Sequence, residues 1–349
     1  MQRPLIGVRR DRAALYLSLT IVAFAVTVMG IRVYLDAAGY PRVGGGGLHV
    51  AHMLWGGLLL VVAAVLVQLY TGSRTLIISA LAAGAGVGLF IDEVGKFITE
   101  SNDYFFAPAA PIIYGTVLLL ALLWFLIRRG GEPTLAEATH AAVEAVRDLA
   151  DGRLSVAARD RALENLEAAG VQTDDPELPG ELLRLLSAPA TEDRLTPSGW
   201  LERGAHVEWL RRLLPDRLER LLVRIGLAFN AFAALMWLLV VLVVVRGEVP
   251  HELIEPSGPI EFPEDPLWLG LLGVVWIVVG LASAIALGLS MLRRHHRAMA
   301  LAQYTLLVAL IAGGLLDTYV AQIGALAIVL MQLALLALVL DQRSRMADV

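Results

Sequence analysis

The sequence predicts an all-α protein: a polytopic integral membrane helical bundle of about eight transmembrane helices with a small cytoplasmic helical insert. Three observations lead to this fold class. Of the 349 residues, 57% are hydrophobic and 17% are charged, whereas a soluble domain has roughly 45–50% and about 25%. The apolar residues lie in runs of about 20, the length that crosses about 30 Å of hydrocarbon. Arginines gather in alternate connecting loops, as they do in cytoplasmic loops of membrane proteins.

Eight apolar runs are predicted as spans. The fourth and seventh are short, and the last two form a tight helical hairpin that turns between Asp317 and Val320. The spans are Ala14–Leu35, Val50–Tyr70, Thr75–Phe97, Pro111–Ile127, Leu221–Val245, Leu267–Leu292, Ala298–Leu316 and Ala321–Leu340.

The arginine distribution predicts the orientation. The segment before the first span, the loops after the second and sixth spans and the C-terminal segment are basic, whereas the alternate loops are neutral or acidic. Because basic residues mark the cytoplasmic side, both termini are predicted to be cytoplasmic, in the plasma (inner) membrane. The agreement of all loops with this orientation supports an even number of spans.

The chain is predicted to consist of three segments: a first four-helix membrane unit (1–129), a cytoplasmic helical insert (130–220) and a second four-helix membrane unit (221–349). In the insert, Thr134–Leu149 and Ser155–Ala169 have apolar residues at helical spacing. The range Gly199–Arg220 resembles an amphipathic helix leading into the fifth span. The insert is expected to pack on the bundle, on a second copy of the chain or on a cytoplasmic protein.

The two membrane units have similar layouts. The stretch Leu54–Val62 resembles Leu267–Val275, and the third and seventh spans both end in a small-residue stretch followed by aspartate, Asp92 and Asp317. A parallel 4+4 repeat, as in some transporters, and chance similarity of Leu- and Gly-rich helices remain open alternatives.

Composition also excludes some chemistry. There is no cysteine, so disulfides and thiolate metal sites are excluded, and a net charge of -5 gives no reason to expect a nucleic-acid partner. Lys96 is the one lysine among 28 basic residues. A compact ammonium group differs chemically from a guanidinium group.

Charged residues within spans are costly and are therefore candidate functional residues. In the third span, the glycines of Gly84–Gly88 predict a closely packed helix surface. Asp92 lies on the same side as Gly88, so it should face the bundle. Glu93 points about a quarter turn away, and Lys96 follows one turn after Asp92.

The second span begins with His49 and His52, which share one helix face. Because successive spans run in opposite directions, the start of the second span and the end of the third meet at the outer membrane surface. Both histidines are therefore expected to converge with Asp92, Glu93 and Lys96. Further polar residues lie at a similar depth, among them Arg32, Asp36 and Tyr114.

Three interpretations of this cluster remain open. His49, His52, Asp92 and Glu93 suit a divalent transition metal such as Zn²⁺, Fe²⁺ or Mn²⁺. Asp92, Glu93 and Lys96 suit an ion or proton pathway, because buried carboxylates and histidines form proton relays in membranes. In the third interpretation the charges neutralise each other and the cluster is structural.

The His-x-x-His start (His49, His52) followed by Trp55-Gly56, together with a glycine-rich helix ending in Asp92-Glu93, resembles a pattern in uncharacterised bacterial multi-pass membrane proteins. The resemblance covers spans two and three and implies a shared helical fold without a known activity. The chain does not resemble the seven-span ceramidase or progestin-receptor-like hydrolases, whose later His-x-x-x-His pair is missing.

The sequence thus favours a transporter or channel-like protein with an outward-facing ion, metal or proton site in its first half. The alternatives are a membrane-embedded metal-dependent hydrolase or lipid-modifying enzyme that uses the same residues, and a membrane scaffold whose insert binds a partner.

Overall fold

The computed structural model describes residues 7–39, 51–99, 106, 108–128, 133–172, 177–196, 215–245 and 266–347. Within these ranges the chain forms helices and one isolated parallel β-bridge, between Ser155 and Thr196. Eight of the described helices are long and apolar enough to cross a membrane. This number matches the eight predicted spans, and many of their leucines and valines are exposed on the protein, as lipid-facing side chains are.

The chain divides into two compact units. The first contains Met1–Glu93 and Leu119–Leu210, and the second contains Val94–Leu118 and Arg211–Val349. The boundary falls inside α5 (Ala109–Arg128), so the two halves of that helix belong to different units. The three segments and the 4+4 repeat expected from the sequence remain predictions.

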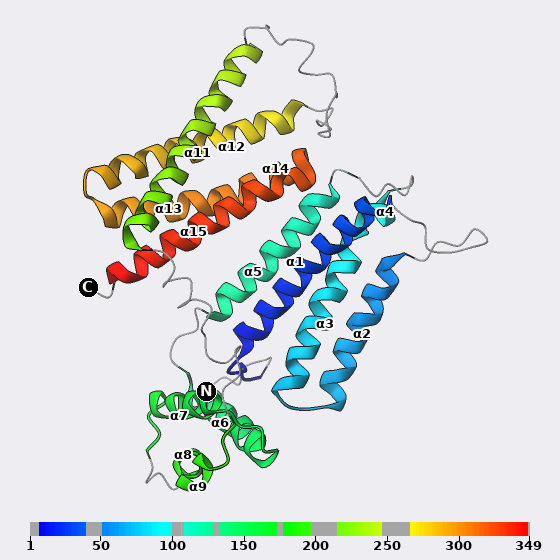
Figure 1. Ribbon diagram of the computed structural model, residues 1–349, viewed down its shortest axis with the longest axis vertical. Helices are drawn as coiled ribbons and strands as arrows, with labels where there is room; N and C mark the ends of the chain where they lie inside the picture. Colours follow the sequence, from blue (N-terminus) through cyan, green and yellow to red (C-terminus); the bar gives the residue numbers. More distant parts are fainter. Residues whose placement is uncertain are drawn as a thin grey trace, which may run out of the picture. The chain divides into compact units, whose positions relative to one another are not determined.

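Three complete apolar helices lie in the first unit beside the second half of α5: α1 (Ala13–Ala37), α2 (His52–Leu69) and α3 (Ser73–Asp92). Helix α3 packs against both of the others (Figure 1). Helix–helix association in lipid depends on close van der Waals packing, which small residues allow. The sequence of α3 provides two such surfaces, one for each neighbour.

One surface of α3 carries Gly84 and Gly88 and faces α1. A Cβ atom on Gly84 would lie 2.2 Å from the Thr20 carbonyl oxygen, and one on Gly88 would lie 3.1 Å from the Phe24 carbonyl oxygen. Glycine is thus the only residue that fits at these two positions without movement of neighbouring atoms. Thr20 also donates a hydrogen bond to the Ala80 carbonyl oxygen, 3.2 Å away.

The other surface of α3 carries Ser79 and Gly86 and faces α2. Gly86 lies opposite Gly56, where a Cβ on either glycine would come within 2.8 Å of the other helix's backbone. Ser79 donates to the Ala63 carbonyl oxygen at 2.9 Å. Residues 80, 84, 88 and 92 therefore follow one face of α3 toward α1, and residues 79, 86 and 93 follow another toward α2.

The third predicted span is shorter than expected. The sequence predicts one helix over Thr75–Phe97, whereas α3 ends at Asp92 and a short helix, α4 (Val94–Ile98), follows. Glu93 separates them with φ −92° and ψ 8°, outside regular helix geometry. The helix is thus interrupted at Asp92 and Glu93, the two acidic residues that the sequence predicts as site residues.

Among the described residues of the first unit, four shorter helices follow α5: α6 (Leu135–Ala150), α7 (Val156–Ala168), α8 (Leu178–Ser187) and α9 (Pro189–Glu192). The first two match the predicted helices of the insert, and begin after N-cap residues Thr134 and Ser155. Alanine and leucine side chains of α6, α7 and α8 form a separate buried core that includes Leu154, Leu166 and Leu186. The predicted amphipathic helix over Gly199–Arg220 lies largely outside the described residues.

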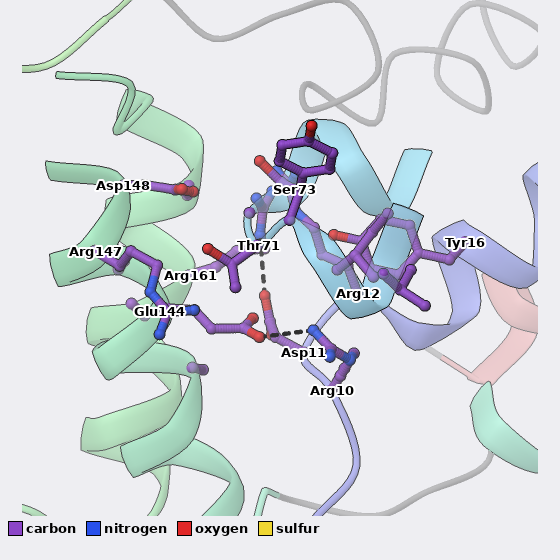
Figure 2. Close-up of a pocket in the computed structure, with 18 residues that line it drawn as sticks. Arg10, Asp11, Arg12, Tyr16, Thr71, Ser73, Glu144, Arg147, Asp148 and Arg161 are labelled. Carbon is purple, nitrogen blue, oxygen red and sulfur yellow. Dashed lines mark hydrogen bonds and ion pairs between the residues drawn. The ribbon is translucent and has the colours of Figure 1, made fainter. Parts of the chain in front are cut away.

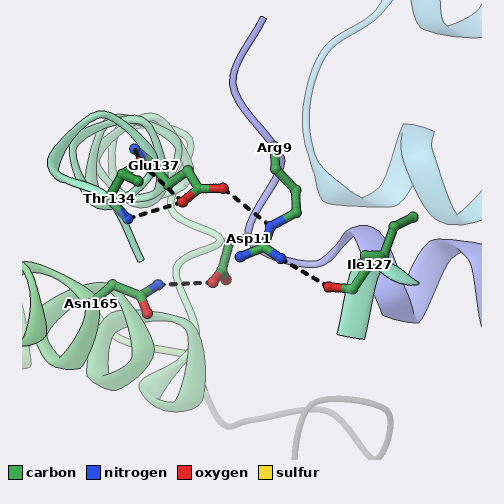
Figure 3. Close-up of polar contacts among 6 residues, drawn as sticks. All are labelled: Arg9, Asp11, Ile127, Thr134, Glu137 and Asn165. Atoms are coloured by element: carbon green, nitrogen blue, oxygen red, sulfur yellow. Dashed lines mark hydrogen bonds and ion pairs between the residues drawn. The ribbon is translucent and has the colours of Figure 1, made fainter. Parts of the chain in front are cut away.

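The residues before α1 bind these shorter helices. Arg9 forms a 3.2 Å ion pair with Glu137 at the start of α6 and donates to the Ile127 carbonyl oxygen near the end of α5 (Figure 3). Asp11 accepts a hydrogen bond of 2.9 Å from the Asn165 side chain on α7. The segment therefore links the end of a predicted span to two helices that are not spans.

The second unit contains α11 (Asp216–Val245), α12 (Pro266–Met291), α13 (His295–Val308), α14 (Gly314–Ala321) and α15 (Leu326–Ala347). Helix α12 packs on α11 and α13, and α15 packs on α13 and α11. The side-chain amides of Asn230 and Gln332 form two reciprocal hydrogen bonds between α11 and α15, of 3.2 and 2.8 Å. Such paired amides satisfy polar atoms that lipid cannot.

The seventh span is longer than predicted. Helix α13 continues through a π-helical turn, Ala309–Gly313, into α14, so one apolar segment covers His295–Ala321. The hairpin turn therefore lies at Gln322–Ala325, after the predicted turn at Asp317–Val320. Asp317 stays inside the helix because the indole of Trp276 on α12 donates to its carboxylate at 3.1 Å.

Candidate functional site

Asp92 ends the surface of α3 that faces α1. Its side chain is fully buried, and its Oδ1 lies 2.5 Å from Nε of Arg32, which is near the end of α1. The Arg32 side chain is only 12% exposed. Because two charges brought out of water are tolerated only when they neutralise each other, this ion pair accounts for the presence of both residues at the end of two apolar helices.

Glu93 follows Asp92 in sequence but faces α2. Its Oε2 accepts a hydrogen bond from the backbone N–H of Met53, 3.0 Å away, in the first turn of α2. Ala51, the N-cap residue of α2, has no side chain able to accept such a bond. A carboxylate supplied by α3 thus takes the capping role and also interacts favourably with the positive end of the α2 dipole.

His52, the first residue of α2, lies between the two carboxylates. Its Nδ1 is 3.2 Å from Glu93 Oε2 and 3.1 Å from the Leu89 carbonyl oxygen. Its Nε2 is 3.6 Å from Asp92 Oδ2. Since both close neighbours of Nδ1 are acceptors, a neutral His52 ring holds its proton on Nδ1. When the ring gains a second proton, this proton lies on Nε2 and points toward Asp92.

The four side chains form a continuous chain of charges across three helices. Arg32 contacts Asp92, Asp92 contacts His52, and His52 contacts Glu93. With both carboxylates ionised and His52 neutral, the formal charge of the four is -1. Protonation of His52 brings it to zero. We call Arg32, His52, Asp92 and Glu93 the charge cluster.

The structure brings together some of the predicted site residues and not others. His52, Asp92 and Glu93 come together as expected from the sequence. His49 lies outside the described residues. Lys96 lies on α4, is half-buried and belongs to the second unit. Arg32 was noted from the sequence only for its depth, although it is the nearest charged neighbour of Asp92.

A metal ligand set is not assembled by the described residues. No three of their His, Asp or Glu side chains lie in positions that could hold a metal ion together. The Arg32 guanidinium also places a fixed positive charge against Asp92, one of the predicted ligands. The metal prediction depends on His49 as well and is not tested by this arrangement.

Comparisons with known proteins give no relative from which a role could be transferred: no family model, no curated protein and no solved structure matches the chain.

The second unit has its own buried carboxylate. Asp317 is 5% exposed, and its Oδ1 accepts the hydrogen bond from Trp276. Its Oδ2 has no hydrogen-bond partner among the described residues. Directly before it, the π-helical turn leaves the Leu310 carbonyl oxygen to accept a 2.7 Å hydrogen bond from the Tyr114 hydroxyl. This arrangement differs from the charge cluster, because no cation pairs with Asp317 in the described part of the chain.

Proposed function

We propose that the chain is a transporter-like integral membrane protein whose charge cluster binds and releases a proton. The observation that carries this proposal is the position of His52 between two buried carboxylates, 3.2 Å from Glu93 and 3.6 Å from Asp92. Histidine is the side chain whose charge ordinarily changes near neutral pH. Titratable groups inside a membrane protein are commonly part of proton pathways.

Charge balance supports proton exchange at His52. Arg32 keeps its charge at every physiological pH and compensates one carboxylate. A protonated His52 adds a second positive charge, 3.2 Å from Glu93 and 3.6 Å from Asp92. Gain and loss of that proton changes how strongly α2 and α3 attract each other at this end, because His52 belongs to α2 and both carboxylates end α3.

The helix interruption at Glu93 supports a role in transport. Transporters place their coupling sites at discontinuous helices, where backbone groups left without helical partners can bind ions. Here the Leu89 carbonyl oxygen near the end of α3 contacts the His52 ring. The protonated ring therefore interacts with a side-chain carboxylate, a backbone carbonyl and the negative end of the α3 dipole.

Arg32 favours proton binding over metal binding. A divalent ion at Asp92 has to approach a carboxylate oxygen while the other oxygen holds a guanidinium at 2.5 Å. A proton requires no such displacement. The outward-facing position of the cluster and the orientation of the termini are predictions from the loop arginines, and belong to this proposal.

Proton flux into proteoliposomes tests the proposal. Purified protein is reconstituted with a pH-sensitive dye inside, and a valinomycin-mediated potassium gradient supplies the driving force. Wild-type protein should acidify or alkalinise the lumen according to the sign of the potential. His52→Gln should remove most of this flux, because glutamine keeps hydrogen-bonding capacity but cannot gain a proton.

His140→Gln is the matched control, since His140 is exposed on α6 and belongs to the same unit. It should leave the flux unchanged. Equal flux in wild type and His52→Gln, or no flux in either, contradicts the proposal. Metal analysis of the same samples separates the alternative: a transition metal lost with His52→Gln would favour the metal site and the hydrolase.

A further inference from the structure

A polar cavity of about 140 Å³ lies in the first unit, at the end of α2 and α3 remote from the charge cluster. It is enclosed by the residues before α1, the connection between α2 and α3, and helices α6 and α7 (Figure 2). A single water molecule needs roughly 10–15 Å³ on the same measure. The cavity therefore has room for a small polyatomic group.

Arginines from three segments line this cavity. Arg10 and Arg12 come from the N-terminal segment, Arg147 from α6 and Arg161 from α7. Arg10 pairs with Glu144 at 3.0 Å, and Arg161 lies 3.7 Å from Asp11 (dashed lines in Figure 2). Arg147 forms no ion pair with any residue that the structure describes. The lining thus holds four arginines and three carboxylates, Asp11, Glu144 and Asp148, so positive charge is in excess.

The start of α3 also faces the cavity. Gly72, its N-cap residue, and Ser73, its first residue, line the wall. Gly72 has φ 102° and supplies no side chain to accept from the first N–H groups of the helix. Those groups remain available, and the α3 dipole directs partial positive charge to the same place. An anion at this position would accept hydrogen bonds from these N–H groups and would be attracted by the helix dipole.

The remaining wall includes apolar side chains at the ends of two candidate membrane spans. Val67 and Leu76 belong to the ends of two spans, His52–Leu69 and Ser73–Asp92. Tyr16 and Tyr70 also line the cavity, and such amphipathic rings are frequent at membrane–water interfaces. A ligand bound here contacts arginines on one side and the end of the apolar region on the other.

We propose that this cavity binds a phosphate group, held by Arg12, Arg147 and the N-terminus of α3. The phosphate is that of an acidic phospholipid headgroup or of a soluble phosphate compound. Both present the same anionic oxygens, which arginine recognises with paired N–H donors. Charge at a cytoplasmic membrane surface favours the same partners, since basic clusters there attract anionic lipids.

Asp148 modifies this binding with pH. Burial raises the pKa of its carboxyl above the usual value, Arg153 and Arg12 lower it, and Glu144 and Asp151 raise it further. Protonation of Asp148 removes a negative charge from the cavity wall. Loss of this charge favours binding of an anion.

The test measures ligand-dependent thermal unfolding of the full chain in a neutral detergent, followed by tryptophan fluorescence. The probes are dioctanoyl phosphatidylglycerol, dioctanoyl phosphatidylcholine and inorganic phosphate. Phosphatidylglycerol should raise the unfolding temperature in a saturable way, and phosphatidylcholine, whose headgroup is neutral overall, should not. A saturable response to inorganic phosphate as well identifies a soluble ligand, whereas a response to phosphatidylglycerol alone identifies the lipid.

Variants establish the location. Arg147→Gln and Arg12→Gln should each weaken apparent binding about 10-fold, as expected for loss of one charge-assisted hydrogen bond. Arg147 is exposed on α6, so its substitution should preserve folding. Arg184→Gln, on α8 and outside the cavity, is the control for equal loss of charge and should bind like wild type. Unchanged binding in both cavity variants, or no stabilisation by either anionic probe, overturns the proposal.

Discussion

Asp92 on α3 and Arg32 on α1 are joined by a 2.5 Å ion pair although the Asp92 side chain is fully buried. Removal of one partner from such a pair leaves an uncompensated charge and costs about 3–5 kcal/mol. We expect Arg32→Gln to lower the free energy of unfolding by this amount. The double variant Arg32→Gln/Asp92→Asn, which has no buried carboxylate at this position, should recover much of the loss. SDS titration of the protein in mixed micelles measures both, and equal stability of wild type and Arg32→Gln would argue against a buried pair.

The contact of α1 with α3 depends on Gly84. A Cβ at this position meets the Thr20 carbonyl oxygen at 2.2 Å, and a backbone atom cannot rotate away as a side chain can. Gly84→Ala should therefore destabilise the protein by about 1–3 kcal/mol. Gly57→Ala is the control, because no atom lies within 4 Å of its added Cβ. In a helix this change should be neutral or stabilising by about 0.5–1 kcal/mol. Equal effects of the two substitutions would refute the close approach.

Asp317 can be neutralised without loss of its hydrogen bond. In Asp317→Asn the amide oxygen still accepts from Trp276, and the second side-chain position, which has no described partner, no longer carries charge. The free energy of unfolding should stay equal or increase. Asp317→Ala leaves the buried indole N–H without its acceptor and should cost about 1–3 kcal/mol. A loss in Asp317→Asn as large as that in Asp317→Ala would mean that the ionised carboxylate is required.

Glu137 should stabilise the start of α6 in a pH-dependent way. The hydrogen bond from the Thr134 backbone lowers the pKa of its carboxyl, and Arg9 lowers it further. A group whose pKa is lowered by folding stabilises the protein above its unfolded pKa, and this stabilisation disappears as the pH falls through the folded value. We expect Glu137→Gln to cost about 1 kcal/mol at neutral pH, the size of a capping interaction. The difference from wild type should vanish in acid. A difference that is constant with pH would assign the effect to packing.

The ionised carboxylate of Asp148 should destabilise the protein, in contrast to that of Glu137. Burial raises the pKa of its carboxyl, so the ionised form disfavours the folded state at neutral pH. The penalty grows as the pH rises from the unfolded pKa to the folded pKa and is constant above it. Asp148→Asn should therefore increase the unfolding temperature at neutral pH and have progressively less effect on acidification. A decrease at neutral pH would show that the attraction of Asp148 to Arg153 and Arg12 outweighs its burial.

The number of spans was predictable because hydropathy over about 20 residues is a property of the chain alone. The boundaries were not. The third span ends at Asp92 because Glu93 turns to cap α2, and the seventh continues past Asp317 because Trp276 binds that carboxylate. Both depend on a partner far away in sequence.

The charge cluster was only partly predictable, because it also depends on contacts between residues far apart in the sequence. The spacing of Gly84, Gly88 and Asp92 shows that they share a helix face, and the opposite directions of spans two and three bring His52 near Glu93. The sequence does not say which helix meets which face of α3. The assignment of Arg32 to Asp92 requires the α1–α3 contact at Gly84, so Arg32 remained only one of several polar residues at that depth.

Nitrogen-15 NMR of histidine-labelled protein in lipid nanodiscs tests the central claim most directly, with His52→Gln used to assign the signals of His52. At alkaline pH the ring should be neutral with its proton on Nδ1, bonded to Leu89 and Glu93. On acidification the ring should gain a second proton on Nε2, toward Asp92. A ring that stays neutral on acidification, or that carries its single proton on Nε2, would contradict a proton-binding charge cluster.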